Sequence, residues 1–441
     1  MVNKVKKKTI FLLICIFILL FSYLLQEKNN ALKNNNNKDI KDIVPNSSNV
    51  DSWYRTWGGV NNDGAKAIAL DLSGNIYIAG YTNSYGGIDM ALVKFDSSGV
   101  LQWNVTWGGG SIDEAYAIAL DSLDNIYLAG RTNSYGVGWM DLCLVKFDNS
   151  GIFQWYRTWG GYMDEVAYEI ALDSSDNIYL AGQTNAPGWA DFVLLKYDNS
   201  GNYQWNRTWS GSGATANAIA LDPSDNVYLA GYTSSNGAGE IDSCLVKYDS
   251  SGVFQWYRTW GGSDGDAPKA ITLDSSNNIY LAGYTFSYGA GGKDMSLVKY
   301  DSSGVFQWYR TWGGSGFDGA NAIALDSSDN VYLAGFGKGT RDMVLVKYNS
   351  SGDYQWYRTW GGSSYENAYA IALDSSDNIY LAGCTYSFGA GNEDMVLVKN
   401  PEASEASKSP SIQSYNLFIL ISITCVISVI LVMSRKLRHK K

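Results

Sequence analysis

Carboxylates are the side chains best placed to do chemistry in this chain. The sequence has 43 Asp and Glu residues but a single histidine, His439, close to the C-terminus. A Ser-His-Asp triad, a Cys-His pair and a histidine-ligated zinc are therefore excluded from residues 51–400. Paired carboxylates could still hydrolyse a glycoside, but no acidic pair stands out from its surroundings as a catalytic pair should. We therefore expect no enzyme.

Calcium is the metal that the acidic residues could hold, because hard cations prefer clustered oxygen ligands. Asp113, Glu114, Asp164 and Glu165 are the candidates for joint chelation. A longer series of aspartates, each followed by Asn four residues on, is better explained by turn capping, since it lacks the later Glu and the Gly of a calcium loop. We expect no cofactor, with calcium left open. The series comprises Asp71, Asp121, Asp173, Asp222, Asp274, Asp326 and Asp374.

Aromatic side chains form the second group of candidates. Trp139 and Trp189 are the only two of 16 tryptophans that lie outside a recurring W-x-x-x-W motif. Aromatic residues beside Asn and Asp suit carbohydrate stacking or protein contact. The alternative is that these aromatics pack locally in unconstrained loops. The ligand-binding candidates are Trp139, Trp189, Tyr135, Tyr162, Tyr288 and Tyr365.

The charge of the chain is unevenly distributed. Residues 51–400 contain 38 acidic and 19 basic side chains, a net charge of −19, whereas most other Lys and Arg residues lie near the two ends. An acidic body argues against nucleic acid as a partner, because neutralising phosphates supplies most of that affinity. The five cysteines show neither a disulfide framework nor a CxxC zinc spacing.

Both ends of the chain contain apolar segments flanked by basic residues. Residues 1–26 have the lysine-rich start and apolar run of a signal peptide or signal anchor. Residues 415–434 are long enough for a transmembrane helix, and the basic tail at 435–441 predicts a cytoplasmic end. Residues 27–50 and 401–414 are polar and are predicted to be linkers. We therefore expect a cell-surface protein, with residues 51–400 outside the cell.

The middle of the chain is one unit written seven times. The W-x-x-x-W motif recurs every 48–52 residues and contains 14 of the 16 tryptophans. A period near 50 residues is typical of a solenoid or a propeller. The motif begins at Trp53, Trp103, Trp155, Trp205, Trp256, Trp308 and Trp356.

Each unit contains four short segments with strand character, separated by Gly, Asp, Asn and Ser clusters. In the sixth unit these segments are 306–312, 322–326, 331–335 and 343–348. No segment has the length or period of a helix. Four strands in each of seven units predict an all-β, seven-bladed β-propeller. If the AIALD strand is innermost, Trp53–Trp57 should complete the last blade beside Met395–Lys399, which removes a free sheet edge.

The repeat resembles a known family. The pattern WGG…AIALDSSDNIYLAGYT…DMVLVKYDSSG is similar to the SBBP repeat, a bacterial and archaeal β-propeller repeat, over all of Trp53–Lys399. Departures are small: Trp209 is followed by SG, and Phe336-Gly337 replaces the usual YT. The resemblance implies a propeller and a surface location but no reaction, since this fold hosts many functions.

Variation between the seven units identifies one face as the functional face. The DSSDN and DSSG turns barely change, whereas the segment after WGG and the segment before the fourth strand both vary. Because strand direction alternates, the two variable loops should emerge on one face and the two constant turns on the other. Recognition loops diverge where scaffold turns repeat, so we expect the variable face to bind.

We interpret the chain as a monomeric, membrane-anchored extracellular propeller that binds a surface glycan or protein. One alternative is a structural component of the cell envelope without a small ligand. A second alternative is a polysaccharide hydrolase or lyase. The sequence does not distinguish a glycan from a protein ligand.

Overall fold

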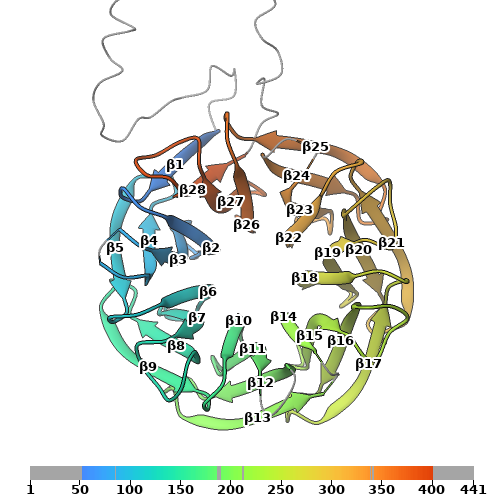
Figure 1. Cartoon of the computed structure of the whole chain (residues 1–441), viewed down its shortest axis with the longest axis horizontal. Coiled ribbons are helices and arrows are strands. Elements are labelled where there is room, and N and C mark those ends of the chain that lie inside the picture. Colours follow the sequence, from blue (N-terminus) through green and yellow to red (C-terminus); the bar gives the residue numbers. More distant parts are fainter. Residues whose placement is uncertain are drawn as a thin grey trace, which may run out of the picture. The chain divides into compact units, whose positions relative to one another are not determined.

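The computed structural model describes residues 52–400 except 85, 186–189, 211–212, 338 and 340–341. These residues form seven four-stranded antiparallel sheets arranged around a central axis (Figure 1). No helix long and apolar enough to cross a membrane occurs among them. The predicted signal segment, both linkers and the predicted transmembrane helix lie outside the described residues.

Each sheet is one blade, and its strands follow one another outward from the axis, with blade 1 formed by β2–β5 and blade 7 by β26–β28 and β1. The innermost strands are β2 (Asp63–Leu70), β6 (Asp113–Leu120), β10 (Glu165–Leu172), β14 (Thr215–Leu221), β18 (Asp266–Leu273), β22 (Gly319–Leu325) and β26 (Glu366–Leu373). The second strands are β3 (Ile76–Thr82), β7 (Ile126–Thr132), β11 (Ile178–Thr184), β15 (Val227–Thr233), β19 (Ile279–Thr285), β23 (Val331–Phe336) and β27 (Ile379–Thr385). The third strands are β4 (Asp89–Phe95), β8 (Asp141–Phe147), β12 (Asp191–Tyr197), β16 (Asp242–Tyr248), β20 (Asp294–Tyr300), β24 (Met343–Tyr348) and β28 (Asp394–Lys399). The outermost strands are β5 (Leu101–Trp107), β9 (Phe153–Trp159), β13 (Tyr203–Trp209), β17 (Phe254–Trp260), β21 (Phe306–Trp312), β25 (Tyr354–Trp360) and β1 (Trp53–Trp57).

The ring closes as the sequence predicts. Strand β1 pairs antiparallel with β28, with Trp53 opposite Lys399 and Trp57 opposite Met395. Ser52 Oγ also donates a hydrogen bond to the Asn400 carbonyl, 2.9 Å away. The last blade is thus built from both ends of the described chain, and the outer edge of β28 is covered.

The core lies between the blades, which explains the continuous apolar runs of the second strands. In β7, Leu128 packs into the cluster shared with blade 1, beside Tyr77 and Leu92. Its neighbours Tyr127 and Ala129 point to the opposite face of the sheet and pack into the cluster shared with blade 3. Since both faces of each sheet are buried, a strict apolar-polar alternation would leave polar groups in the core.

Every inner strand contains a β-bulge, and this makes the strands longer than predicted. In blade 6 the sequence predicts a strand from Ala322, whereas β22 begins at Gly319. The pairing with β23 shifts register between Ala320 and Ala322, which leaves Asn321 as the extra residue. A bulge breaks the side-chain alternation, so the first half of the strand carries no recognisable pattern.

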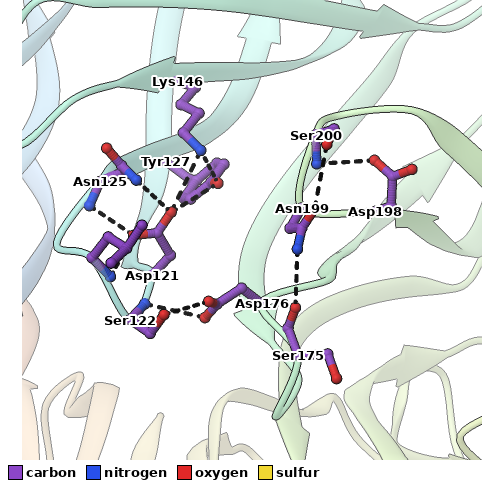
Figure 2. Close-up of polar contacts among 11 residues, drawn as sticks. Asp121, Ser122, Asn125, Tyr127, Lys146, Ser175, Asp176, Asp198, Asn199 and Ser200 are labelled. Atoms are coloured by element: carbon purple, nitrogen blue, oxygen red, sulfur yellow. Dashed lines mark hydrogen bonds and ion pairs between the residues drawn. The ribbon is translucent and has the colours of Figure 1, made fainter.

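The DSSDN turns are held by hydrogen bonds to the first aspartate, as Figure 2 shows for blade 2. Asp121 accepts bonds from the Asn125 backbone N–H at 2.8 Å and from its side-chain amide at 2.9 Å. Tyr127 Oη donates to the same carboxylate at 3.1 Å, and Lys146 Nζ lies 3.4 Å from it. Burial alone would raise the pKa of Asp121, but the hydrogen bonds from Asn125 hold this pKa below its usual value. These contacts support turn capping as the role of the series.

The second aspartate of this turn joins neighbouring blades. Asp176 adopts a positive φ of 60°, and its carboxylate accepts bonds from the Ser122 N–H at 3.1 Å and the Ser122 hydroxyl at 2.6 Å (Figure 2). Aspartate tolerates this conformation better than most residues. The repeated turn is therefore scaffold, with a contact that links blade 2 to blade 3.

The outer strands are joined by the arginine of the WYRTW motif. Arg157 Nε donates to the Gly201 carbonyl at 2.8 Å, and its guanidinium lies 4.6 Å from the centroid of the Trp155 ring. Gly201 has a φ of +77°, and a Cβ there would lie 2.7 Å from that ring. The arginine thus bonds to backbone rather than to the repeating acids, and the glycine of the DSSG turn is required by both φ and space.

Candidate functional site

The two variable loops of neighbouring blades touch each other on one face of the propeller. The loop between β7 and β8 meets the loop between β9 and β10 through a bridge of Met140 to Asp164. The Glu165 N–H donates to the Met140 carbonyl at 2.8 Å. Equivalent bridges join Ile88 to Ile112, Asn62 to Glu393 and Lys293 to Phe317. The predicted arrangement of the variable loops on one face is confirmed.

Four exposed side chains gather where blades 2 and 3 meet, and we call them the blade 2–3 patch. They are Val137, Trp139, Tyr162 and Met163, with exposed fractions of 59, 75, 82 and 54%. The loops that carry them are in close contact, since a Cβ on Gly138 would lie 2.8 Å from the Tyr162 Cα. Exposed apolar groups on two loops in contact mark an interaction site more strongly than scattered ones.

Asp141 fixes the loop that carries Trp139. This residue opens β8, is 3% exposed, and accepts a hydrogen bond from the Val137 N–H at 2.9 Å. Burial, together with the nearby charge of Glu165 and against the Val137 bond, raises the pKa of Asp141 to about 6. The aspartates that open other third strands, including Asp294 and Asp394, bond to their preceding loops in the same way. The Trp139 side chain is thus presented on an anchored loop.

Tyr135 and Tyr288 pack against the scaffold instead of lying open to solvent. Tyr135 Oη donates to the Gly108 carbonyl at 2.9 Å, and its ring centroid lies 4.9 Å from that of Trp107. Tyr288 Oη bonds the Gly261 carbonyl in the same way at 3.0 Å. For these two residues the structure favours the local-packing alternative.

Tyr365 and Trp189 complete the aromatic candidates. Tyr365 is half-buried in blade 7, where its ring lies 5.9 Å from that of Tyr386 and its hydroxyl accepts a bond from Asn367 at 3.2 Å. Trp189 lies outside the described residues. The structure therefore brings Trp139 and Tyr162 together and leaves the other aromatic candidates elsewhere or undescribed.

Three of the four calcium candidates have separate hydrogen-bond partners. Asp113 is fully buried and accepts bonds from the Gly109 N–H at 2.9 Å and Ser134 Oγ at 2.6 Å. Glu165 accepts the equivalent bond from a glycine N–H in the next blade. Glu114 is paired with Arg131, whose Nε lies 2.7 Å away, and Asp164 is half-buried in its loop. No three His, Cys, Asp or Glu side chains of the described residues group to hold a metal ion. Calcium binding here stays a prediction.

Sequence reasoning missed a group of side chains close to the axis, carried by the bulges of the inner strands. These seven positions differ strongly between blades, whereas the alanines beside them are nearly constant. Comparing the seven repeats with one another position by position would have found them. The bulge residues are Lys66, Tyr116, Tyr168, Asn217, Lys269, Asn321 and Tyr369.

Glu169 is the carboxylate that departs most clearly from the repeat. It follows the bulge in β10, where each of the other six inner strands has alanine. Burial raises the pKa of Glu169 to about 7, against a hydrogen bond from the Ile170 N–H to its own carboxylate. A carboxyl group with this pKa could exchange protons near neutral pH, but no described acidic partner accompanies it.

A family model described as a beta-propeller repeat, SBBP, matches residues 58–87 and 106–136. These segments run from the end of one W-x-x-x-W motif through the inner and second strands of blades 1 and 2. The protein is a seven-bladed β-propeller, and two segments of it match the SBBP repeat.

Two curated proteins are similar over part of the chain. The regulatory protein FlaEY of Caulobacter vibrioides is 28% identical over 110 residues, which are 22% of this chain and 12% of that protein. An uncharacterized WD repeat-containing protein, L264, of Acanthamoeba polyphaga mimivirus is 22% identical over 172 residues, 38% of this chain and 10% of that protein. The match thus spans about a tenth of the length of either relative.

Solved structures share the fold at low sequence identity. Hydrazine synthase of Kuenenia stuttgartiensis gives a TM-score of 0.52 at 10% identity over 74% of this chain and 94% of the matched chain. The Pan2 WD40 domain of Neurospora crassa gives a TM-score of 0.50 at 10% identity over 81% and 98%. Such likeness shows the fold alone.

Proposed function

We propose that this protein is a membrane-anchored extracellular binding module, whose variable face recognises a surface glycan or a surface protein. The observation that carries the proposal is the blade 2–3 patch, where Trp139 and Tyr162 lie largely exposed on two loops in contact. Aromatic side chains of this kind dominate the energy of recognition surfaces, because they bury a large area at a small entropic cost.

The positions of Trp53 and Lys399 support a propeller whose variable face is directed away from its attachment point. Trp53 begins β1 and pairs with Lys399 at the end of β28. In the other blades the DSSG turn joins the third and fourth strands at this point, on the constant face. The chain therefore enters and leaves the propeller on the face opposite the variable loops. If the flanking apolar segments lie in a membrane, the variable face is directed away from the attachment point.

A binding screen against polysaccharides and envelope proteins tests the proposal, with the patch variant Trp139→Ala/Tyr162→Ala compared with the unmodified chain. We expect the variant to bind the selected partner at least about tenfold more weakly, the effect of losing about 1.4 kcal/mol at a contact centre. The thermal unfolding midpoint should not change, because both side chains are exposed.

Leu123→Ala is the matched control. Leu123 is 72% exposed but lies in a constant turn on the opposite face. Equal binding by the patch variant, or equal loss in the Leu123 variant, would rule out the patch as the recognition site.

A further inference from the structure

Most basic side chains of the propeller belong to its repeating scaffold. Thirteen of the 19 Lys and Arg residues in 51–400 recur at two fixed positions, the arginine of the outer strand and the lysine near the end of the third strand. The six that do not recur are Lys66, Arg131, Lys269, Lys293, Lys338 and Arg341.

Two of these six cations lie close to acidic side chains. Arg131 forms an ion pair with Glu114. Lys66 makes a cation-π contact with the Tyr369 ring, 3.6 Å from its centroid. Burial lowers the pKa of Lys66, and the nearby charges of Glu393 and Glu114 act against this effect. Lys338 and Arg341 lie outside the described residues. Lys269 and Lys293 remain to be explained.

Lys269 and Lys293 lie where blade 5 meets blade 6. Lys269 is the bulge residue of β18, and Lys293 immediately precedes β20. The Lys293 ammonium lies 3.9 Å from the centroid of the Tyr284 ring in blade 5 and 5.2 Å from that of Phe336 in blade 6. Both lysines are half-buried, so they can meet a ligand only from the axis or the variable face.

No acidic side chain compensates these two charges within the described part of the chain. Neither ammonium has an ion pair or a hydrogen bond there, although the propeller as a whole carries a net charge of −19. Burial lowers the pKa of both lysines, and the charge of Lys269 lowers the pKa of Lys293 further. Two like charges held close together in a half-buried position destabilise each other, and an anion between them would remove that cost.

Aromatic side chains lie beside the two lysines on the variable face. Phe286 and Phe317 are 42 and 66% exposed, and their ring centroids are 6.4 Å apart. Lys293 forms a backbone bridge with Phe317, so the cationic and aromatic groups belong to one surface. A ligand with an acidic group and an apolar part would contact both.

We propose that the junction of blades 5 and 6 binds the anionic group of a ligand, a carboxylate or a phosphate, between Lys269 and Lys293. This site lies three blades from the blade 2–3 patch and does not depend on it. Ammonium groups form charge-assisted hydrogen bonds with such anions, and these are roughly twice as strong as neutral ones.

Isothermal titration calorimetry on the full-length chain in neutral detergent tests the site, with citrate and inorganic phosphate as probes and sodium chloride added to equal ionic strength. We expect saturable binding of at least one probe. Phosphate alone would assign phosphoryl ligands, and citrate alone would assign carboxylate ligands.

The repeat itself supplies the variants. Lys269→Asn copies Asn217 and Asn321 at the same position of blades 4 and 6, and Lys293→Ile copies Ile88 and Ile241. Each should weaken binding by about tenfold or more, the effect of losing one charged hydrogen bond. Two separate variants keep the test decisive if one of them fails to fold.

Lys66→Asn is the matched control, because Lys66 occupies the same bulge position but contacts Tyr369. It should leave the affinity unchanged, as should the variant of Trp139 and Tyr162. Absence of saturable binding, equal binding by the Lys269 and Lys293 variants, or an equal loss in the Lys66 variant would each overturn the inference. If only the variant of Trp139 and Tyr162 loses binding of the selected partner, that result supports the proposed function and says nothing about the anion site.

Discussion

At the scale of single residues, the informative positions are those where one or two blades depart from the others. Glu169 replaces an alanine near the axis, and Lys269 replaces the tyrosine or asparagine found at most bulges. A scaffold position is expected to repeat, since the same packing recurs in each blade. A charged group that most blades lack must instead be accommodated locally or serve a ligand.

Glu169 should make the stability of the propeller depend on pH. Its pKa of about 7 in the folded protein lies above the ordinary value of 4.5, so the folded state holds more protons between these values. The free energy of unfolding therefore falls as the pH rises from about 4.5 to about 7. Glu169→Ala should remove this fall. From acid pH to pH 8, the free energy of unfolding of this variant should gain roughly 2 kcal/mol relative to that of the unmodified chain.

Urea unfolding of both chains at a series of pH values measures this difference. Glu169→Gln, which keeps the shape but not the charge, should follow the alanine variant. A stability difference that stays constant across the pH range would show that the Glu169 carboxyl is ionised in the folded state as in the unfolded one.

At the scale of elements, the bulge of each inner strand packs directly against a glycine of the adjacent second strand. In blade 2 the bulge at Tyr116 brings the backbone of β6 against Gly130 of β7. A Cβ on Gly130 would lie 1.9 Å from the Glu114 carbonyl oxygen. The glycine recurs in all seven units because backbone, and not a movable side chain, fills the space beside it.

Gly130→Ala should therefore destabilise the fold strongly, by about 3 kcal/mol or more, because overpacking against backbone cannot relax by rotamer changes. Gly110→Ala is the matched control, since a Cβ there meets no atom within 4 Å. Thermal unfolding followed by circular dichroism compares the two variants. If Gly130→Ala has the same thermal unfolding midpoint as the unmodified chain, β6 and β7 do not approach as closely as described.

At the scale of the whole molecule, the closing blade decides the stability of the ring. Only β1 links the start of the described chain to β28, whose outer edge would otherwise be exposed. Seven blades packed on both faces need every junction, because each core cluster is shared by two neighbours. An open edge would also invite pairing with other chains.

Removing residues 1–57 should lower the thermal unfolding midpoint and cause self-association, whereas removing residues 1–50 should leave β1 and the midpoint intact. Size-exclusion chromatography with light scattering reports the association, and calorimetry reports the midpoint. Equal behaviour of the two truncations would show that the β1–β28 pairing does not hold the ring closed.

The sequence determined the number of blades, the order of their strands and the closure by Trp53–Trp57, because these follow from a repeat whose pattern survives in every unit. It also predicted which loops share a face, since alternation of strand direction requires it. Only the tertiary structure decided which candidates meet. Trp139 and Tyr162 are 23 residues apart, and they lie on neighbouring loops because of how the loops of two blades pack. Lys269 and Glu169 were not predicted from the sequence. The bulge adds one residue to the strand and so shifts the alternation of side chains from which strand positions are predicted.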